Sequence, residues 1–165
     1  MRTNYHKYLK NAEESKLSIE ILQQCQTNQN ESLSQFYKNN NIAYQIFNFT
    51  DKIINYYHKS DLVITRSGAS VLGELINVKI PFISIPLPSS ADNHQFKNAE
   101  FYEKKGYGYL LEEKDIKNKL FNLINSIFRD KSLLKGIKSN QRQYSDKDIF
   151  KKLNIEIEKI LNEKN

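Results

Sequence analysis

The chain has 165 residues, a formal net charge of +6 and a mean hydropathy of −0.67, and its length fits one domain with a single core. Ten tyrosines, nine phenylalanines and many isoleucines argue against a disordered chain. No apolar run approaches the roughly 20 residues of a membrane span, and the N-terminus carries no apolar signal-peptide segment. The single cysteine, Cys25, excludes an internal disulfide and a cysteine-built zinc site, and we expect it to be buried at a strand end.

The basic charge does not by itself indicate nucleic-acid binding. Lysines are scattered among acidic residues, and arginine, which reads nucleic acids through its bidentate guanidinium, occurs only four times. We therefore expect no nucleic-acid partner. A diffuse attraction to an anionic membrane surface needs no specific geometry, and we retain it as an expectation.

Hydrophobic periodicity predicts helices and strands that alternate along the chain. Helices are expected over residues 5–12, 31–40, 51–60 with Asp51 as cap, 70–77 after a loop over 66–69, 94–105, and from 115 almost to the end with interruptions near 130 and 136. Strands are expected over residues 17–22, 42–49, 62–64, 80–85 and 107–111. Because no strand is followed by a hairpin turn, the pattern predicts an α/β fold, a Rossmann-like doubly wound parallel sheet in one domain over residues 1–165.

The most informative segment is 61–74, DLVITRSGASVLGE. An apolar strand runs into a small-residue turn at Gly68 and then into a helix, whose free N–H groups suit a phosphate or diphosphate. Glu74 lies one turn further into the helix, where a carboxylate can accept hydrogen bonds from adjacent hydroxyls such as a ribose diol. The spacing alone also fits a plain strand, turn and helix with a surface glutamate.

A second polar segment, residues 86–99, follows the next strand and opens onto the same edge of the predicted sheet. Asp92 or Asn93 can cap the helix that begins near His94. Gln95 and Asn98 lie at i and i+3 on one helix face, and such paired donors and acceptors suit sugar hydroxyls. In the alternative interpretation, Asp92 is only a cap and His94 a solvated surface residue.

Other site chemistries find little support in the sequence. The three histidines have no ligand spacing between them, so we expect neither a metal site nor a cofactor. A Gly-x-Ser-x-Gly elbow is absent, and Cys25 has no adjacent histidine to activate it as a nucleophile.

Together, residues 61–111 resemble the C-terminal domain of the MurG family, bacterial transferases of glycosyltransferase family 28 that move GlcNAc from UDP-GlcNAc to a lipid-linked acceptor. The family pattern is approximately R-[SA]-G-A-x-T-x-x-E, followed by P-x-P-x-[AS]-x-D-[ND]-H-Q-x-x-N-A, and both parts occur here at the right separation. The resemblance extends from about Leu17 to the C-terminus. It implies the donor-binding half of a GT-B glycosyltransferase, without a cofactor or a protein-bound metal.

The resemblance also implies roles for particular residues. Backbone N–H groups of the turn and helix start would hold the diphosphate, Glu74 the ribose hydroxyls, and His94 and Gln95 the GlcNAc hydroxyls. The UDP-GlcNAc-binding residues implied are Thr50, whose backbone would contact uracil, Arg66, Gly68, Ala69, Ser70, Val71, Glu74, His94, Gln95 and Asn98. The implied reaction is inverting and converts lipid I into lipid II for peptidoglycan, at the cytoplasmic face of the bacterial inner membrane.

This sequence departs from the family pattern in three ways. Val71 replaces the usual threonine, the first strand with its Gly-Gly-Ser-Gln loop is missing, and so is the N-terminal domain that holds lipid I. We therefore expect no catalytic residue in this chain and no transferase activity from the chain alone. The alternative is a non-catalytic donor-binding subunit that needs a membrane-associated partner, as in the two-subunit dolichol-linked GlcNAc transferase.

Two further expectations concern exposed apolar surface. Without its first strand, the sheet should expose an edge lined by Leu62, Ile64 and Ile83. The C-terminal helix, residues 149–161, carries an isoleucine and leucine face that we interpret as a packing face, with membrane contact as the alternative.

Overall fold

The computed structural model describes residues 19–144 and, near the C-terminus, residues 154, 155, 157, 159 and 160. The helix predicted over residues 5–12 lies outside the described residues, and so does most of the helix predicted over 149–161. Within the described part of that segment, the side chains of Ile155, Ile157 and Ile160 are exposed.

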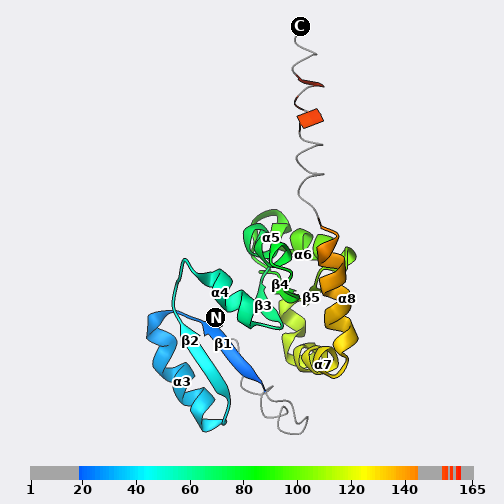
Figure 1. The fold of residues 1–165 in the computed structure, drawn as a ribbon. Helices are drawn as coiled ribbons and strands as arrows, with labels where there is room; N and C mark the ends of the chain where they lie inside the picture. The colour runs from blue at the N-terminus through cyan, green and yellow to red at the C-terminus, as the bar shows by residue number, and fades with distance from the viewer. Residues whose placement is uncertain (1–18, 145–153, 156, 158, 161–165) are drawn as a thin grey trace.

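Helices and strands alternate along the chain, as the periodicity predicts (Figure 1). The strands are β1 (Glu20–Gln24), β2 (Ala43–Phe47), β3 (Val63–Arg66), β4 (Phe82–Ile85) and β5 (Tyr109–Leu110). The helices are α3 (Asn30–Asn39), α4 (Ile53–Lys59), α5 (Ala69–Asn77), α6 (His94–Lys104), α7 (Ile116–Arg129) and α8 (Lys131–Arg142). Short 3₁₀ turns are η1 (Thr27–Gln29), η2 (Ala91–Asn93) and η3 (Glu113–Asp115).

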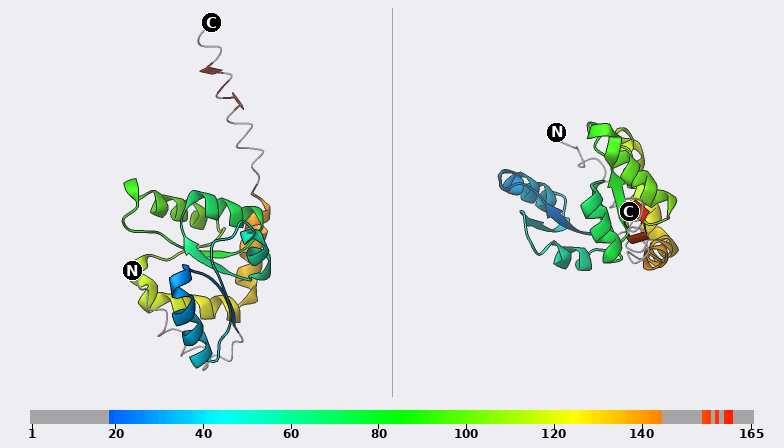
Figure 2. Two further views of the ribbon diagram at one scale, coloured as in Figure 1. Left: turned by 90° about the vertical axis from the view of Figure 1, so that its left-hand side faces the viewer. Right: turned by 90° about the horizontal axis from the view of Figure 1, so that it is seen from above.

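Every strand pair is parallel, which confirms the predicted α/β class. The described strands form two sheets, β1-β2 and β3-β4-β5, rather than one continuous sheet. Helices α5 and α6 lie on one side of the three-stranded sheet and α7 on the other (Figures 1 and 2). The carboxyl ends of β3 and β4 therefore lead directly into the two segments that the sequence singled out.

Strand β4 forms the centre of the core because all four of its residues are buried. Phe82 packs with residues of α4 and α5 in a cluster of Tyr57, Leu72, Leu75, Ile76, Ile80 and Phe82. On the opposite face, Ile83 and Ile85 pack with residues of α7 in a cluster of Ile83, Ile85, Leu111, Ile116, Leu120 and Ile127. Apolar side chains on both faces are the pattern of a strand covered by helices on both sides.

Three predictions about helix ends are wrong. Asp51 does not cap α4, because the Lys52 N–H donates instead to Thr50 Oγ1 at 3.1 Å. Neither Asp92 nor Asn93 caps α6 through its side chain, because both residues adopt left-handed backbone with φ of 47° and 55°. Gly136 does not interrupt α8, since glycine inside a helix costs only about 1 kcal/mol.

The predicted break near residue 130 is confirmed. Asp130 separates α7 from α8 and accepts hydrogen bonds from the Ser132 N–H at 2.9 Å and the Ser132 hydroxyl at 2.6 Å. These bonds lower the pKa of the Asp130 carboxyl. The carboxylate therefore holds the first turn of α8.

Burial of the predicted apolar edge differs from expectation. Ile64 is 40% exposed, whereas Ile83 is fully buried because β4 lies in the middle of its sheet. Leu62 is half-buried. Cys25 follows β1 as predicted, but it is only half-buried and its thiol donates to Asn30 Oδ1 at 3.1 Å. None of the helices described is long and apolar enough to cross a membrane.

Candidate functional site

The N-terminus of α5 forms the centre of the candidate site. Gly68 precedes the helix with extended backbone, and the first intrahelical bond runs from the Leu72 N–H to the Gly68 carbonyl at 3.1 Å. The N–H groups of Ala69, Ser70 and Val71 therefore have no partner within the helix. Because Ala69 and Ser70 are exposed, these donors are accessible to an anion at the positive end of the helix dipole.

A buried hydroxyl lies beside this helix start. Ser67 is fully buried, and within the part of the chain that the structure describes its Oγ has no hydrogen-bond partner. The Ser67 carbonyl accepts a hydrogen bond from Asn98 Nδ2 at 3.2 Å, so α6 holds the turn ahead of α5. Asn98 thus fixes the backbone of the turn, and its contact with a donor sugar stays a prediction.

The side chain of Val71 is part of the apolar packing and does not contribute to an anion site. It packs against the cluster that contains Leu72 and Phe82. A threonine at this position would carry a hydroxyl that could bond to an anion at the helix start, but valine has only methyl groups, which pack against the cluster. The substitution in this sequence therefore leaves Val71 with its N–H as the only donor toward an anion.

Glu74 is exposed one turn into α5, and Tyr57 of α4 lies near enough for its hydroxyl to be influenced by the Glu74 charge. Tyr57 is a core residue with only 8% of its surface exposed. Burial, the charge of Glu74 and a hydrogen bond to that carboxylate all raise the pKa of the Tyr57 hydroxyl. The hydroxyl therefore stays protonated and lies near enough to the Glu74 carboxylate to serve as its donor. Sequence reasoning missed Tyr57 because periodicity marks it only as a core position.

The segment between β4 and α6 presents His94 to solvent. His94 Nδ1 lies 2.7 Å from the Ala91 carbonyl oxygen. Because a carbonyl oxygen only accepts, Nδ1 carries the hydrogen of this bond. In the neutral ring this tautomer leaves Nε2 as a hydrogen-bond acceptor for a ligand hydroxyl.

The side-chain oxygen of Gln95 already has a hydrogen-bond partner within the chain. Its Oε1 accepts the Leu87 N–H at 3.0 Å, which holds the start of the loop after β4. Its own N–H donates to Ser90 Oγ at 3.4 Å. Among residues 19–144 no partner is found for Gln95 Nε2, so this group is available to donate to a ligand hydroxyl.

Arg66 joins three segments at the carboxyl edge of the three-stranded sheet. Its Nη1 donates to Glu113 Oε2 at 2.6 Å and to the carbonyl oxygens of Pro86 at 3.3 Å and Ile85 at 3.5 Å. The guanidinium thus ties the end of β3 to the end of β4 and to η3. This arrangement makes Arg66 a clamp on the site, a role that the spacing of sequence motifs could not indicate because Glu113 is 47 residues away.

Thr50 lies in the other sheet, after β2, and is half-buried. None of the described contacts joins it to the turn at Gly68. Its neighbour Phe49 is 91% exposed, which is unusual for so large an apolar side chain. All the other predicted site residues therefore lie at the ends of β3 and β4 or in the helices that follow them. Thr50 lies apart from this group, after β2.

The described residues contain no cluster of three or more histidine, cysteine or acidic side chains that could hold a metal ion. The site offers backbone N–H groups, an exposed carboxylate, an imidazole and a carboxamide. These groups can bind an anion and several hydroxyls at once.

Comparison with known proteins identifies the domain. Residues 5–153 match the glycosyltransferase family 28 C-terminal domain. A protein of Pelagibacter ubique (strain HTCC1062) is 39% identical over 150 residues, which are 88% of this chain and 41% of that protein. A protein of Rickettsia bellii (strain RML369-C) is 39% identical over 115 residues, 67% of this chain and 32% of that protein. Both are named UDP-N-acetylglucosamine–N-acetylmuramyl-(pentapeptide) pyrophosphoryl-undecaprenol N-acetylglucosamine transferase.

The fold is also that of a solved structure. The crystal structure of Acinetobacter baumannii MurG superposes with a TM-score of 0.73 at 23% identity, and covers 86% of this chain and 41% of that one. The chain thus spans less than half the length of these relatives. The family match extends over most of the chain and includes every residue of the candidate site. The chain belongs to glycosyltransferase family 28 and contains its C-terminal domain.

Proposed function

We propose that this chain is a single UDP-GlcNAc-binding domain, residues 1–165, of a transferase that moves GlcNAc from UDP-GlcNAc to lipid I and forms lipid II. The observation that carries the proposal is the start of α5, where exposed N–H groups lie one helical turn from the carboxylate of Glu74. The names of the Pelagibacter and Rickettsia relatives support the same donor and acceptor.

Each part of the donor has a matching group in this proposal. The diphosphate accepts from the N–H groups of residues 69–71, and the ribose hydroxyls donate to Glu74. His94 Nε2 accepts from a GlcNAc hydroxyl, and Gln95 Nε2 donates to another. The backbone of Thr50 contacts the uracil, and the exposed ring of Phe49 offers an apolar surface to the base.

The chemistry follows from the charge that develops on the donor. The 4-hydroxyl of the acceptor attacks C1 of GlcNAc, and the bond from C1 to the diphosphate oxygen breaks with inversion. Negative charge grows on the departing UDP, where the N-terminus of α5 stabilises it. The net charge of +6 supports attachment of the complete enzyme to an anionic membrane surface, on the cytoplasmic side of the inner membrane.

Calorimetric titration of the chain with UDP-GlcNAc tests this proposal. We expect saturable binding of UDP-GlcNAc and weaker binding of UDP, because UDP lacks the sugar that His94 and Gln95 would contact. ADP serves as the control for non-specific attraction of a nucleoside diphosphate to a basic protein. Equal affinities for ADP and UDP-GlcNAc would refute the proposal.

Removing the hydroxyl of Tyr57 should weaken donor binding through Glu74. We expect Tyr57→Phe to raise the Kd for UDP-GlcNAc about fivefold, since the loss of one orienting hydrogen bond costs about 1 kcal/mol. Tyr56→Phe removes the same atom from the adjacent, half-buried tyrosine and should leave the Kd unchanged. In a Glu74→Ala background, Tyr57→Phe should cause no further rise in the Kd. A further rise in that background would assign Tyr57 a purely structural role.

Breaking the clamp at Arg66 should have a smaller effect. We expect Glu113→Ala to raise the Kd about threefold to fivefold, because a partly exposed ion pair contributes up to about 1 kcal/mol. The effect should shrink as salt is added. Glu112→Ala, which removes a neighbouring carboxylate paired only with surface Lys114, is the matched control and should bind like the parent chain.

A further inference from the structure

The positive charge of the chain is concentrated in helices α7 and α8. Residues 116–142, which span these two helices, contain seven basic side chains and one acidic side chain, a net charge of +6. The other 138 residues carry 18 basic and 18 acidic side chains. The net charge of the whole chain, also +6, therefore arises from one pair of consecutive helices.

Helix α8 gathers four of these basic residues on one face. Lys131, Lys135, Lys138 and Arg142 follow one another at i, i+4, i+7 and i+11. At about 100° per residue they lie within an arc of about 60°, and at about 1.5 Å per residue they extend over about 16 Å of the helix. No acidic residue lies within α8. We call these four residues the basic stripe.

Buried contacts fix the orientation of α8. Ile137 and Gln141 are its buried residues, and Gln141 Nε2 donates to the carbonyl oxygens of Ile80 at 3.0 Å and of Tyr107 at 2.7 Å. At the other end of the helix, Asp130 caps the first turn. Because α8 is held at both ends, it presents one constant face to solvent.

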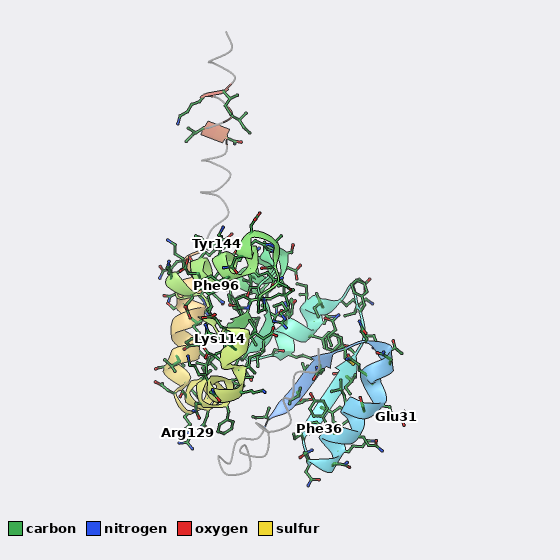
Figure 3. All side chains as sticks on the ribbon, turned by 180° about the vertical axis from the view of Figure 1, so that it is seen from behind. Glu31, Phe36, Phe96, Lys114, Arg129 and Tyr144 are labelled. Carbon is green, nitrogen blue, oxygen red and sulfur yellow. The ribbon has the colours of Figure 1, made fainter. Side chains whose placement is uncertain are left out.

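The basic stripe belongs to that solvent-facing surface. Lys131, Lys135 and Arg142 are exposed, and Lys138 is half-buried. Helix α8 lies on the side of the molecule that is turned away from the two-stranded sheet (Figures 1 and 3). Arg129, which is labelled in Figure 3, is also exposed and lies just before the helix. One side of the domain therefore carries an uncovered basic surface.

The charges of the stripe are not neutralised within the domain. None of its four residues takes part in an ion pair with another residue that the structure describes. The two acidic residues that flank α7 are engaged elsewhere, because Asp115 pairs with Lys119 and Asp130 accepts from Ser132. A row of uncompensated cations about 16 Å long matches an extended array of negative charges better than one small anion.

Among extended anionic arrays, a lipid surface fits this stripe best. Three of its four residues are lysines, whose flexible stems place point charges among lipid headgroups without a fixed geometry. Nucleic-acid sites favour the planar guanidinium of arginine instead. The lipid acceptor proposed above also lies in a membrane. The inference thus rests on the membrane attachment proposed above, and it names the surface that makes the contact.

We propose that the basic stripe of α8 docks this domain on an anionic lipid surface, with the helix axis parallel to the membrane plane. Each lysine or arginine close to such a surface strengthens binding about fivefold. Because the charges outside α7 and α8 balance, the stripe gives the domain one preferred orientation on the membrane. A diffuse attraction by net charge alone would give no such orientation.

Sedimentation of the full chain with lipid vesicles tests the proposal. One set of vesicles contains phosphatidylcholine with about one third phosphatidylglycerol, and the control set contains phosphatidylcholine alone. We expect the chain to bind the anionic vesicles and not the neutral ones. Binding should be lost at about 1 M salt, where the Debye length falls to about 3 Å.

Variants of the stripe measure its contribution. The triple variant Lys131→Gln, Lys135→Gln and Arg142→Gln should lower the partition coefficient on anionic vesicles about 100-fold, and Lys135→Gln alone about fivefold. All three side chains are exposed, so circular dichroism should show the parent fold. The Kd for UDP-GlcNAc should equal that of the parent chain, because the stripe is not part of the candidate site.

A second triple variant is the matched control for charge. Lys38→Gln, Lys59→Gln and Lys97→Gln remove the same charge from exposed positions on α3, α4 and α6. Since these lysines lie outside α7 and α8, the control should change the partition coefficient by less than about threefold. The proposal is overturned if the two triple variants lose binding equally, because net charge would then attract the chain.

Two further outcomes would also overturn the proposal. If the parent chain does not bind the anionic vesicles, the membrane attachment proposed above fails as well, whereas donor binding is measured separately by calorimetry. If the parent chain binds a DNA duplex of about 20 base pairs more tightly than the vesicles at the same salt, and the α8 variant loses this binding, the stripe is a nucleic-acid site instead.

Discussion

Replacing Glu74 with alanine is expected to raise the Kd for UDP-GlcNAc about 100-fold. The carboxylate is exposed on α5, and in the proposed complex it accepts hydrogen bonds from both ribose hydroxyls. Hydrogen bonds to a charged group contribute about 1.5 kcal/mol or more each, so the loss of two corresponds to about two orders of magnitude. Isothermal titration with UDP-GlcNAc measures the effect directly.

The control for this variant is Glu100→Ala. Glu100 is a carboxylate on α6 whose ion pair with Lys104 lies at the surface, so its removal should change neither affinity nor stability noticeably. The Tm of Glu74→Ala should also stay close to that of the parent, because the side chain is not part of the core. An unchanged Kd in Glu74→Ala would remove the ribose assignment, even if UDP-GlcNAc binds elsewhere.

The sequence predicted the helices and strands best where hydrophobic periodicity and burial coincide. The fully buried strand β4 and the helix from Ala69 to Asn77 were predicted closely because one pattern dictates each of them. Strand β1 begins later than predicted, at Glu20, and includes two glutamines. One of them, Gln23, accepts a hydrogen bond from the buried Tyr37 hydroxyl, a tertiary contact that no local pattern reveals.

The candidate site was predictable in composition but not in its partnerships. Motif spacing indicated Glu74, His94 and Gln95, which the structure presents around the ends of β3 and β4. It could not indicate that Glu113 holds Arg66 or that Tyr57 lies beside Glu74, since both partners come from distant turns or helices. Such partners depend on how elements pack, and the sequence carries no short-range signal for them.

The two sheets show the same limit at the level of the fold. The periodicity predicted one parallel sheet, whereas the described strands form two, β1-β2 and β3-β4-β5. The exposure of the residues predicted to line an open edge differed as well, because Ile83 belongs to a middle strand whereas Ile64 belongs to an edge strand. Strand order, which arises only on folding, decides between these two outcomes.

Gly108→Ala is expected to lower the stability of the domain by about 1–3 kcal/mol, through overpacking beneath the site. A Cβ at Gly108 would lie 2.4 Å from the Phe82 ring, and Phe82 is fully buried at the start of β4. The ring has no room to move, because it packs among the residues of α4 and α5. For a chain of this length, the loss corresponds to a fall in Tm of roughly 2–4 °C per kcal/mol.

Gly73→Ala provides the matched comparison, since it adds the same methyl group inside α5. Nothing lies within 4 Å of a Cβ at Gly73, and alanine favours a helix over glycine by about 1 kcal/mol, so this variant should be more stable than the parent. Urea denaturation of the two variants should therefore shift the midpoint in opposite directions. A Gly108→Ala variant as stable as the parent would mean that the Phe82 ring can shift without cost, and the tight packing inferred for this part of the core would then be wrong.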